Sequence, residues 1–122
     1  MDILEYRNFC ISFPGVTEEF PFDEKTLVFK VMGKMFALCN VDEFKSVNLK
    51  CDPTKAVFLR EEYPNLVNPG YHMNKKHWNT VSTAGNLPDE KIREWTSDSY
   101  QLVVKNLTKK DREKLKSLSK KK

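Results

Sequence analysis

The chain has 122 residues, of which 39% are hydrophobic and 31% charged, a size and composition that fit one folded domain and exclude a disordered polymer. Its net charge is +4, but residues 108–122 hold eight basic and two acidic side chains, which leaves −2 for the remainder. We therefore expect a single domain over residues 1–122 with a basic C-terminal segment at 108–122.

The cysteines and the first nine residues indicate the cellular compartment in which we expect the protein. Cys10, Cys39 and Cys51 are odd in number and include no C-x-x-C pair, which argues against a disulfide framework and a structural zinc site. No apolar run approaches the roughly 20 residues of a membrane span, and residues 1–9 carry acids where a signal peptide would be basic and then apolar. We expect a cytoplasmic protein.

The N-terminal segment predicts a helix followed by a loop. Apolar residues recur at spacings near three and four over residues 2–13, with Asp2 in position to cap the helix. Residues 16–24 combine four acids with a proline, a composition that disfavours a central strand. We expect an acidic loop at 16–24.

Three strands are predicted next. Apolar and mixed positions alternate over residues 26–32, 35–41 and 46–51. Gly33-Lys34 separates the first two runs and has the length and chemistry of a tight hairpin turn. These strands are expected to form a meander with one buried face and one partly wet face.

The middle of the chain predicts a helix and a further strand. Asp52 followed by proline opens a helix at 52–63, because aspartate is a good N-cap and proline fits the first helical turn. Residues 65–76 are dense in turn formers, and residues 77–82 alternate like a strand.

The C-terminal third predicts two helices. A long helix at 89–107 is expected to be interrupted or bent near 96–99, where residues of poor helix propensity cluster. Thr108 with Asp111 resembles a capping box that begins a second, short helix. Together the elements predict an α+β fold, in which an antiparallel sheet of hairpins packs against helices.

The segment GYHMNKKHWNTV, at residues 70–81, is the most concentrated polar and aromatic stretch of the chain. Two lysines, two histidines, a tyrosine and a tryptophan occur there without an acid, a combination that can pair phosphates and stack on bases. The alternative interpretation is that Tyr71 and Trp78 are core or edge aromatics and that the lysines belong to a solvated turn.

Metal and catalytic sites have weaker support. His72 and His77, five residues apart, match no metal-ligand signature, and the cysteines fall at apolar positions where a buried thiol is inert. The acids of 16–24 lack the spacing of a calcium loop, and no glycine-rich phosphate loop is present. We expect no cofactor, no metal and no enzymatic activity.

A series of short matches resembles the MmcQ/YjbR family of small bacterial proteins. FPGVTEEFPF, TLVFKVMGKMFAL, VNLKCDP, LREEYP, NPGYHMNKKHWNTV and SYQLVVKNL occur in that order, and PGYHMNKKHWNTV is the most specific of them. The resemblance implies a CyaY/frataxin-like α+β domain whose hairpins form a "double wing" proposed to bind DNA. The contacts that it implies are Lys30, Lys34, Lys50, His72, Lys75, Lys76, His77 and Trp78.

Three hypotheses follow. The first is weak, non-enzymatic DNA binding through phosphate contacts from the hairpin lysines, the segment from His72 to Trp78 and the basic tail, with affinity that falls steeply with salt. The second is a protein or peptide interaction module that uses the sheet edge and the aromatic segment. The third is a small-molecule or metal site at His72 and His77.

Overall fold

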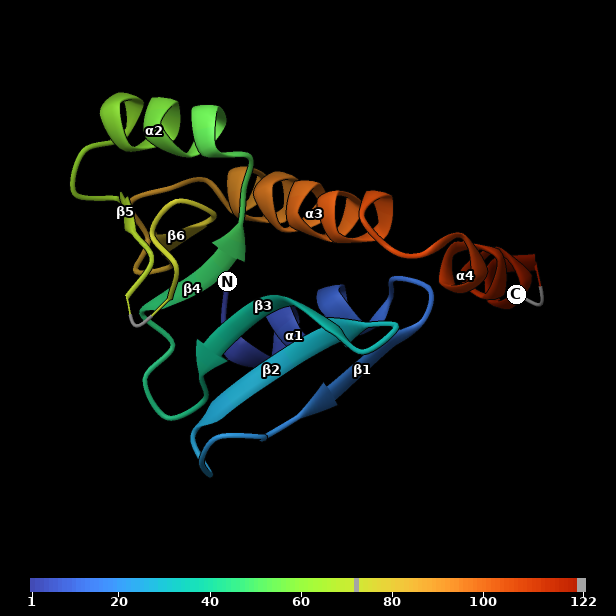
Figure 1. Cartoon of the computed structure of the whole chain (residues 1–122). Helices are drawn as coiled ribbons and strands as arrows, with labels where there is room; N and C mark the ends of the chain where they lie inside the picture. The colour runs from blue at the N-terminus through green and yellow to red at the C-terminus, as the bar shows by residue number, and fades with distance from the viewer. Residues whose placement is uncertain (72, 121–122) are drawn as a thin grey trace.

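The computed structural model describes residues 1–71 and 73–118 in full and the backbone of 119–120. These residues form an antiparallel six-stranded sheet of order β1-β2-β3-β4-β6-β5, with helices packed against it (Figure 1). The predicted α+β class is therefore confirmed. The strands are β1 Val16–Glu19, β2 Thr26–Val31, β3 Lys34–Asn40, β4 Ser46–Lys50, β5 Val67–Pro69 and β6 Trp78–Ser82, and the helices are α1 Ile3–Ile11, α2 Pro53–Glu62, α3 Asp89–Lys105 and α4 Lys109–Lys120.

Helices α1, α2 and α3 cover one face of the sheet. The main core there joins helix residues such as Tyr6, Leu59 and Trp95 to the strand residues Phe29 and Leu49. Asp2 and Asp52 cap α1 and α2 as predicted, because their carboxylates accept backbone N–H groups of the first turn.

A smaller cluster lies on the opposite face. Val28, Leu38 and Trp78 are buried together there, with Met35 and Met73 packed against them. The tryptophan of the polar and aromatic segment is thus a packing residue, and both faces of the sheet contribute to stability.

The acidic loop expected at 16–24 is wrong in part, because β1 forms there as an edge strand that pairs with β2. Two basic neighbours compensate its acids: the Arg7 guanidinium donates to the Glu18 carboxylate at 2.6 Å, and Lys30 forms an ion pair with Glu19. The proline at position 21 follows the strand and removes no ladder hydrogen bond.

The hairpin turn lies one residue earlier than predicted. Met32 and Gly33 have φ values of 50° and 81°, the left-handed conformations that a two-residue turn matched to strand twist requires. Lys34 instead begins β3. Within the turn-rich segment 65–76, the short edge strand β5 also forms.

Helix α3 runs through residues 96–99 without the interruption that the sequence allowed. Thr96 and Ser99 are buried, and their hydroxyls donate to the carbonyls of Ile92 and Phe36 at 2.7 and 2.6 Å. Tyr6 adds a hydrogen bond to the Thr96 hydroxyl at 2.9 Å. Tertiary partners therefore offset the weak helix propensity of this segment.

Helix α4 is docked on the domain. Thr108 accepts the backbone N–H of Asp111 at 3.1 Å, as the capping pattern predicts. Leu115 is buried against the loop between α1 and β1, where a Cβ built on Gly15 would lie 2.5 Å from the Leu115 Cδ1 and 3.7 Å from the Met32 sulfur. The basic segment thus lies close to the β2–β3 turn.

Candidate functional site

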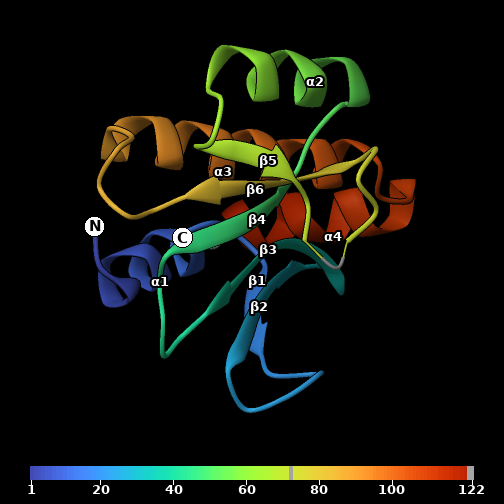
Figure 2. The ribbon, with the colours of Figure 1, turned by 90° about the vertical axis from the view of Figure 1, so that its left-hand side faces the viewer.

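Antiparallel pairing brings most of the predicted contact residues to the same end of the sheet. Val31 pairs with Lys34 at the β2–β3 turn, and Lys50 pairs with Trp78 where β4 ends and β6 begins. The C-terminus of α3, the start of α4 and residues 73–77 lie on this side (right-hand side of Figure 2). We call this surface the basic end; it comprises Lys34, Lys50, Lys75, Lys76, His77, Lys105 and α4.

Acidic side chains gather where the same strands and helices have their other ends. These positions are the β1–β2 loop, the β3–β4 loop, the C-terminus of α2 and the N-terminus of α3. They carry Asp23, Glu24, Asp42, Glu43, Glu61, Glu62, Asp89 and Glu90. Residues outside the C-terminal segment have a net charge of −2, but their basic and acidic side chains are unevenly distributed. Basic side chains predominate at the basic end, and acidic side chains predominate at the opposite ends of the strands.

The predicted residues differ in how accessible they are. Lys34, Lys75 and Lys76 are exposed, whereas Lys50 and His77 are half-buried. Among the exposed three, Lys75 donates from Nζ to the Gly70 carbonyl at 3.3 Å.

Three predicted contacts are placed differently. Lys30 lies within β2 and is paired with Glu19. Trp78 is 7% exposed, which leaves little ring surface for stacking on a base. His72 lies outside the described residues.

Helix α4 contributes basic residues that the list of predicted contacts omits. Within residues 109–118, none of its basic side chains makes a salt bridge. Its exposed cations are Lys109, Lys110, Arg112, Lys114 and Lys116. The charge run is visible in the sequence, but its position beside the β2–β3 turn depends on how Leu115 docks.

A partly buried polar network holds Lys75 and Trp78 against α2. The Arg60 guanidinium donates to Asn79 Oδ1 at 2.7 Å and to the carbonyls of Lys75 and Trp78. The Asn79 amide in turn donates to the Ala56 carbonyl at 3.3 Å. One arginine therefore fixes α2, β6 and the lysine-bearing loop together, which no sequence pattern indicated.

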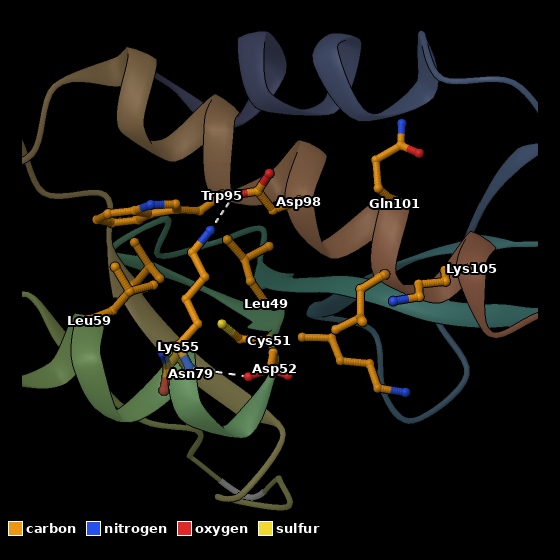
Figure 3. A pocket seen from close by; sticks show the side chains of 13 residues that line it. Leu49, Cys51, Asp52, Lys55, Leu59, Asn79, Trp95, Asp98, Gln101 and Lys105 are labelled. Atoms are coloured by element: carbon orange, nitrogen blue, oxygen red, sulfur yellow. Dashed lines mark hydrogen bonds and ion pairs between the residues drawn. The ribbon is translucent and has the colours of Figure 1, made fainter.

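A groove of about 310 Å³ lies between α2 and α3, above β4 and β6 (Figure 3). Its apolar lining comes from Leu49, Leu59, Val81, Trp95 and Leu102. Its polar lining consists of Lys50, Cys51, Asp52, Lys55, Asn79, Asp98, Gln101 and Lys105. A neighbouring hollow shares several of these residues and extends to His77.

The thiols are unsuited to nucleophilic attack near neutral pH. Burial raises the pKa of Cys10, and it raises the pKa of Cys39 to about 12. Cys51, in the groove, is half-buried and also has a raised pKa, mainly through desolvation. Among the described residues there is no group of three or more metal-ligating side chains, and no helix is long and apolar enough to cross a membrane.

Comparison with known proteins identifies the family. The family model YjbR matches residues 11–102. The chain is 37% identical over 112 residues to YbdF of Escherichia coli O157:H7, with 89% of each chain covered, and 36% identical over 116 residues to YjbR of Escherichia coli K12, with 94% of this chain and 97% of the relative covered. Neither name carries an activity.

Two crystal structures resemble the fold. A Deinococcus radiodurans protein with a DUF419 domain superposes with a TM-score of 0.87 at 41% identity, covering 93% of this chain and 87% of its own. A Pseudomonas syringae protein superposes with a TM-score of 0.70 at 26% identity, covering 84% of this chain and 98% of its own. Since the family model spans most of the sequence and the relatives align over most of their lengths, the chain belongs to the YjbR family.

Proposed function

We propose that this protein binds nucleic acid weakly through phosphate contacts at the basic end and that it catalyses no reaction. The observation that carries the proposal is the separation of charge along the strands: lysines predominate at one set of ends, and at the other the eight acids outnumber the lysines Lys25, Lys45 and Lys91. A polyanion approaching the basic end meets attraction there and is repelled by the opposite ends. The same charge pattern favours one orientation on the nucleic acid.

The type of contact follows from the side chains available. Lys34, Lys76 and the cations of α4 up to Lys116 are exposed and, within the described residues, make no salt bridge. Lysine ammonium groups pair with phosphates without reading base sequence. Because Trp78 is buried, stacking on bases forms no part of the proposal. The expected binding is therefore electrostatic, of low sequence specificity and sensitive to salt.

Fluorescence anisotropy with a labelled duplex tests this mechanism. Lys34→Gln and Lys76→Gln should each weaken binding, and each should reduce the slope of log affinity against log salt by about 0.9 if the residue contacts one phosphate. Lys45→Gln is the matched control, because Lys45 is an exposed lysine in the β3–β4 loop, at the acidic ends.

The proposal requires the control to behave differently from the two test variants. If Lys45→Gln lowers affinity and slope as much as Lys34→Gln and Lys76→Gln do, binding reflects overall charge, and the basic end is not the site. Affinity that stays constant from low to physiological salt would contradict phosphate contacts altogether.

The alternative prediction is an interaction module that uses the sheet edge and the aromatic segment. The sequence suggests Trp78→Ala as its test, but the structure favours a different substitution. Trp78→Ala would remove a buried side chain from the cluster with Val28 and Leu38, so lost capture of a partner could reflect unfolding. Tyr71, which is exposed, is the better position to substitute.

A further inference from the structure

We propose that the groove between α2 and α3 binds a small amphipathic carboxylate, with an apolar body beside Trp95 and a carboxylate beside Lys50 and Lys105. Lys50 and Lys105 also belong to the basic end, but the apolar lining of the groove lies outside the surface proposed to contact phosphates. The ligand site depends on the shape and charge of one groove and does not require the proposed function to be correct.

The inner part of the groove is apolar. Leu49 and Val81 line it from the sheet, Leu59 from α2, and Trp95 and Leu102 from α3. The volume of about 310 Å³ is near the lower end for pockets that hold small organic ligands, about 300–1,000 Å³. A body the size of two fused aromatic rings suits such a space.

The indole of Trp95 is held in place at one end of the groove. Its ring meets the ring of Tyr63 edge to face, with centroids 5.1 Å apart, an arrangement that aromatic pairs favour. In Figure 3 the Trp95 ring and Lys105 lie at opposite ends of the α3 side chains that line the groove. An apolar body and a charged group would thus meet different ends of the same groove.

The acidic groups of the groove already have partners. Asp98 forms an ion pair with Lys55 at 2.9 Å, which bridges α3 and α2. Asp52 accepts the backbone N–H groups of Thr54 and Lys55 at 3.0 and 3.3 Å as the cap of α2. Asp98 is therefore neutralised by a cation, whereas Asp52 keeps one negative charge and has its Oδ1 engaged by the cap.

Two cations of the groove have no such partner. Within the described residues, neither Lys50 nor Lys105 makes a salt bridge, although both line the groove and the neighbouring hollow. These two lysines outweigh the single unpaired carboxylate of Asp52, so the charge that remains for a ligand is positive. Charge complementarity selects an anion, and the limited volume selects a compact one.

Titration of the full ¹⁵N-labelled chain with 2-naphthoate, followed by NMR, tests the site. The neutral analogue 2-naphthamide keeps the ring system and removes the charge. We expect naphthoate to shift the amides of residues 49–52, 79–81 and 95–105, and to bind at least tenfold more tightly than naphthamide. Naphthoate shifts that map elsewhere, or equal affinity for the two probes, would overturn the proposal.

Variants locate the two halves of the site. Lys105→Gln should weaken naphthoate binding at least threefold and leave naphthamide unaffected, whereas Leu102→Trp should fill the groove and abolish binding of both probes. Lys34→Gln, which removes a lysine of the basic end outside the groove lining, should change neither. A loss of naphthoate affinity in Lys34→Gln equal to that in Lys105→Gln would refute a specific site.

Failure of this inference can be distinguished from failure of nucleic-acid binding. Leu102→Trp keeps every lysine, so it should retain affinity for duplex DNA while losing naphthoate. Naphthoate binding without DNA binding would support the groove and reject the proposed function, and the reverse result would do the opposite.

Discussion

Ser99→Ala should destabilise the fold far more than a serine-to-alanine change in a helix ordinarily does. Ser99 is fully buried in α3. Its hydroxyl donates to the Phe36 carbonyl at 2.6 Å and accepts the backbone N–H of Lys50 at 2.9 Å. Phe36 in β3 and Lys50 in β4 lie just beyond the last paired residues, Ala37 and Leu49. The Ser99 hydroxyl therefore bridges the two strands where their direct hydrogen bonding ends.

The magnitude follows from the groups left behind. Alanine leaves the Phe36 carbonyl and the Lys50 N–H without their partner, and an unsatisfied buried polar group costs about 1–3 kcal/mol. Closer approach of the two strand ends would recover part of this loss. We expect the free energy of unfolding to fall by about 2–4 kcal/mol, a large share of the about 5–15 kcal/mol typical of a domain.

Urea denaturation of Ser99→Ala and Ser97→Ala measures the effect. Ser97 is half-buried on the same helix, so both variants share the gain in helix propensity, a few tenths of a kcal/mol. The difference between them therefore isolates the buried hydroxyl. A difference below about 0.5 kcal/mol, the ordinary scatter of surface substitutions, would refute the reasoning.

Three further predictions concern packing and pH. Gly70→Ala should lower the melting temperature, because the new Cβ would lie 2.8 Å from the Trp78 Cβ; an unchanged melting temperature would contradict this. Leu115→Ala should increase hydrogen exchange in α4 and leave the sheet protected, since Leu115 is its buried contact near Gly15; equal protection of α4 in both proteins would show that it docks by other means. Burial raises the pKa of the Cys39 thiol from 9.0 to about 12, so the unfolded chain releases this proton first and stability should fall above pH 9, by about 1.4 kcal/mol per pH unit for this thiol. Urea titrations should show a correspondingly shallower decline for Cys39→Ala, and identical slopes would refute the assignment.

The candidate site was only partly predictable from the sequence. The segment around Lys75 and Lys76 was singled out because it contains no acid, and the structure places it at the basic end. The groove was not predicted, because its lining comes from segments as far apart as Leu49 and Lys105. The burial of Trp78 could not be predicted from composition, because a tryptophan among lysines can be either exposed or buried.

Most helices and strands can be predicted from the sequence, because they depend on local chemistry. Alternating apolar residues specify the strands, and the caps Asp2, Asp52 and Thr108 set where three helices begin. Features that depend on contacts across the chain were decided only by the tertiary structure. The glutamates of β1 become acceptable in a strand once Arg7 and Lys30 lie beside them, and α3 stays continuous because distant groups bind its hydroxyls. The basic end and the groove also depend on contacts between remote residues. Strand register and helix docking bring together the residues that form each of them.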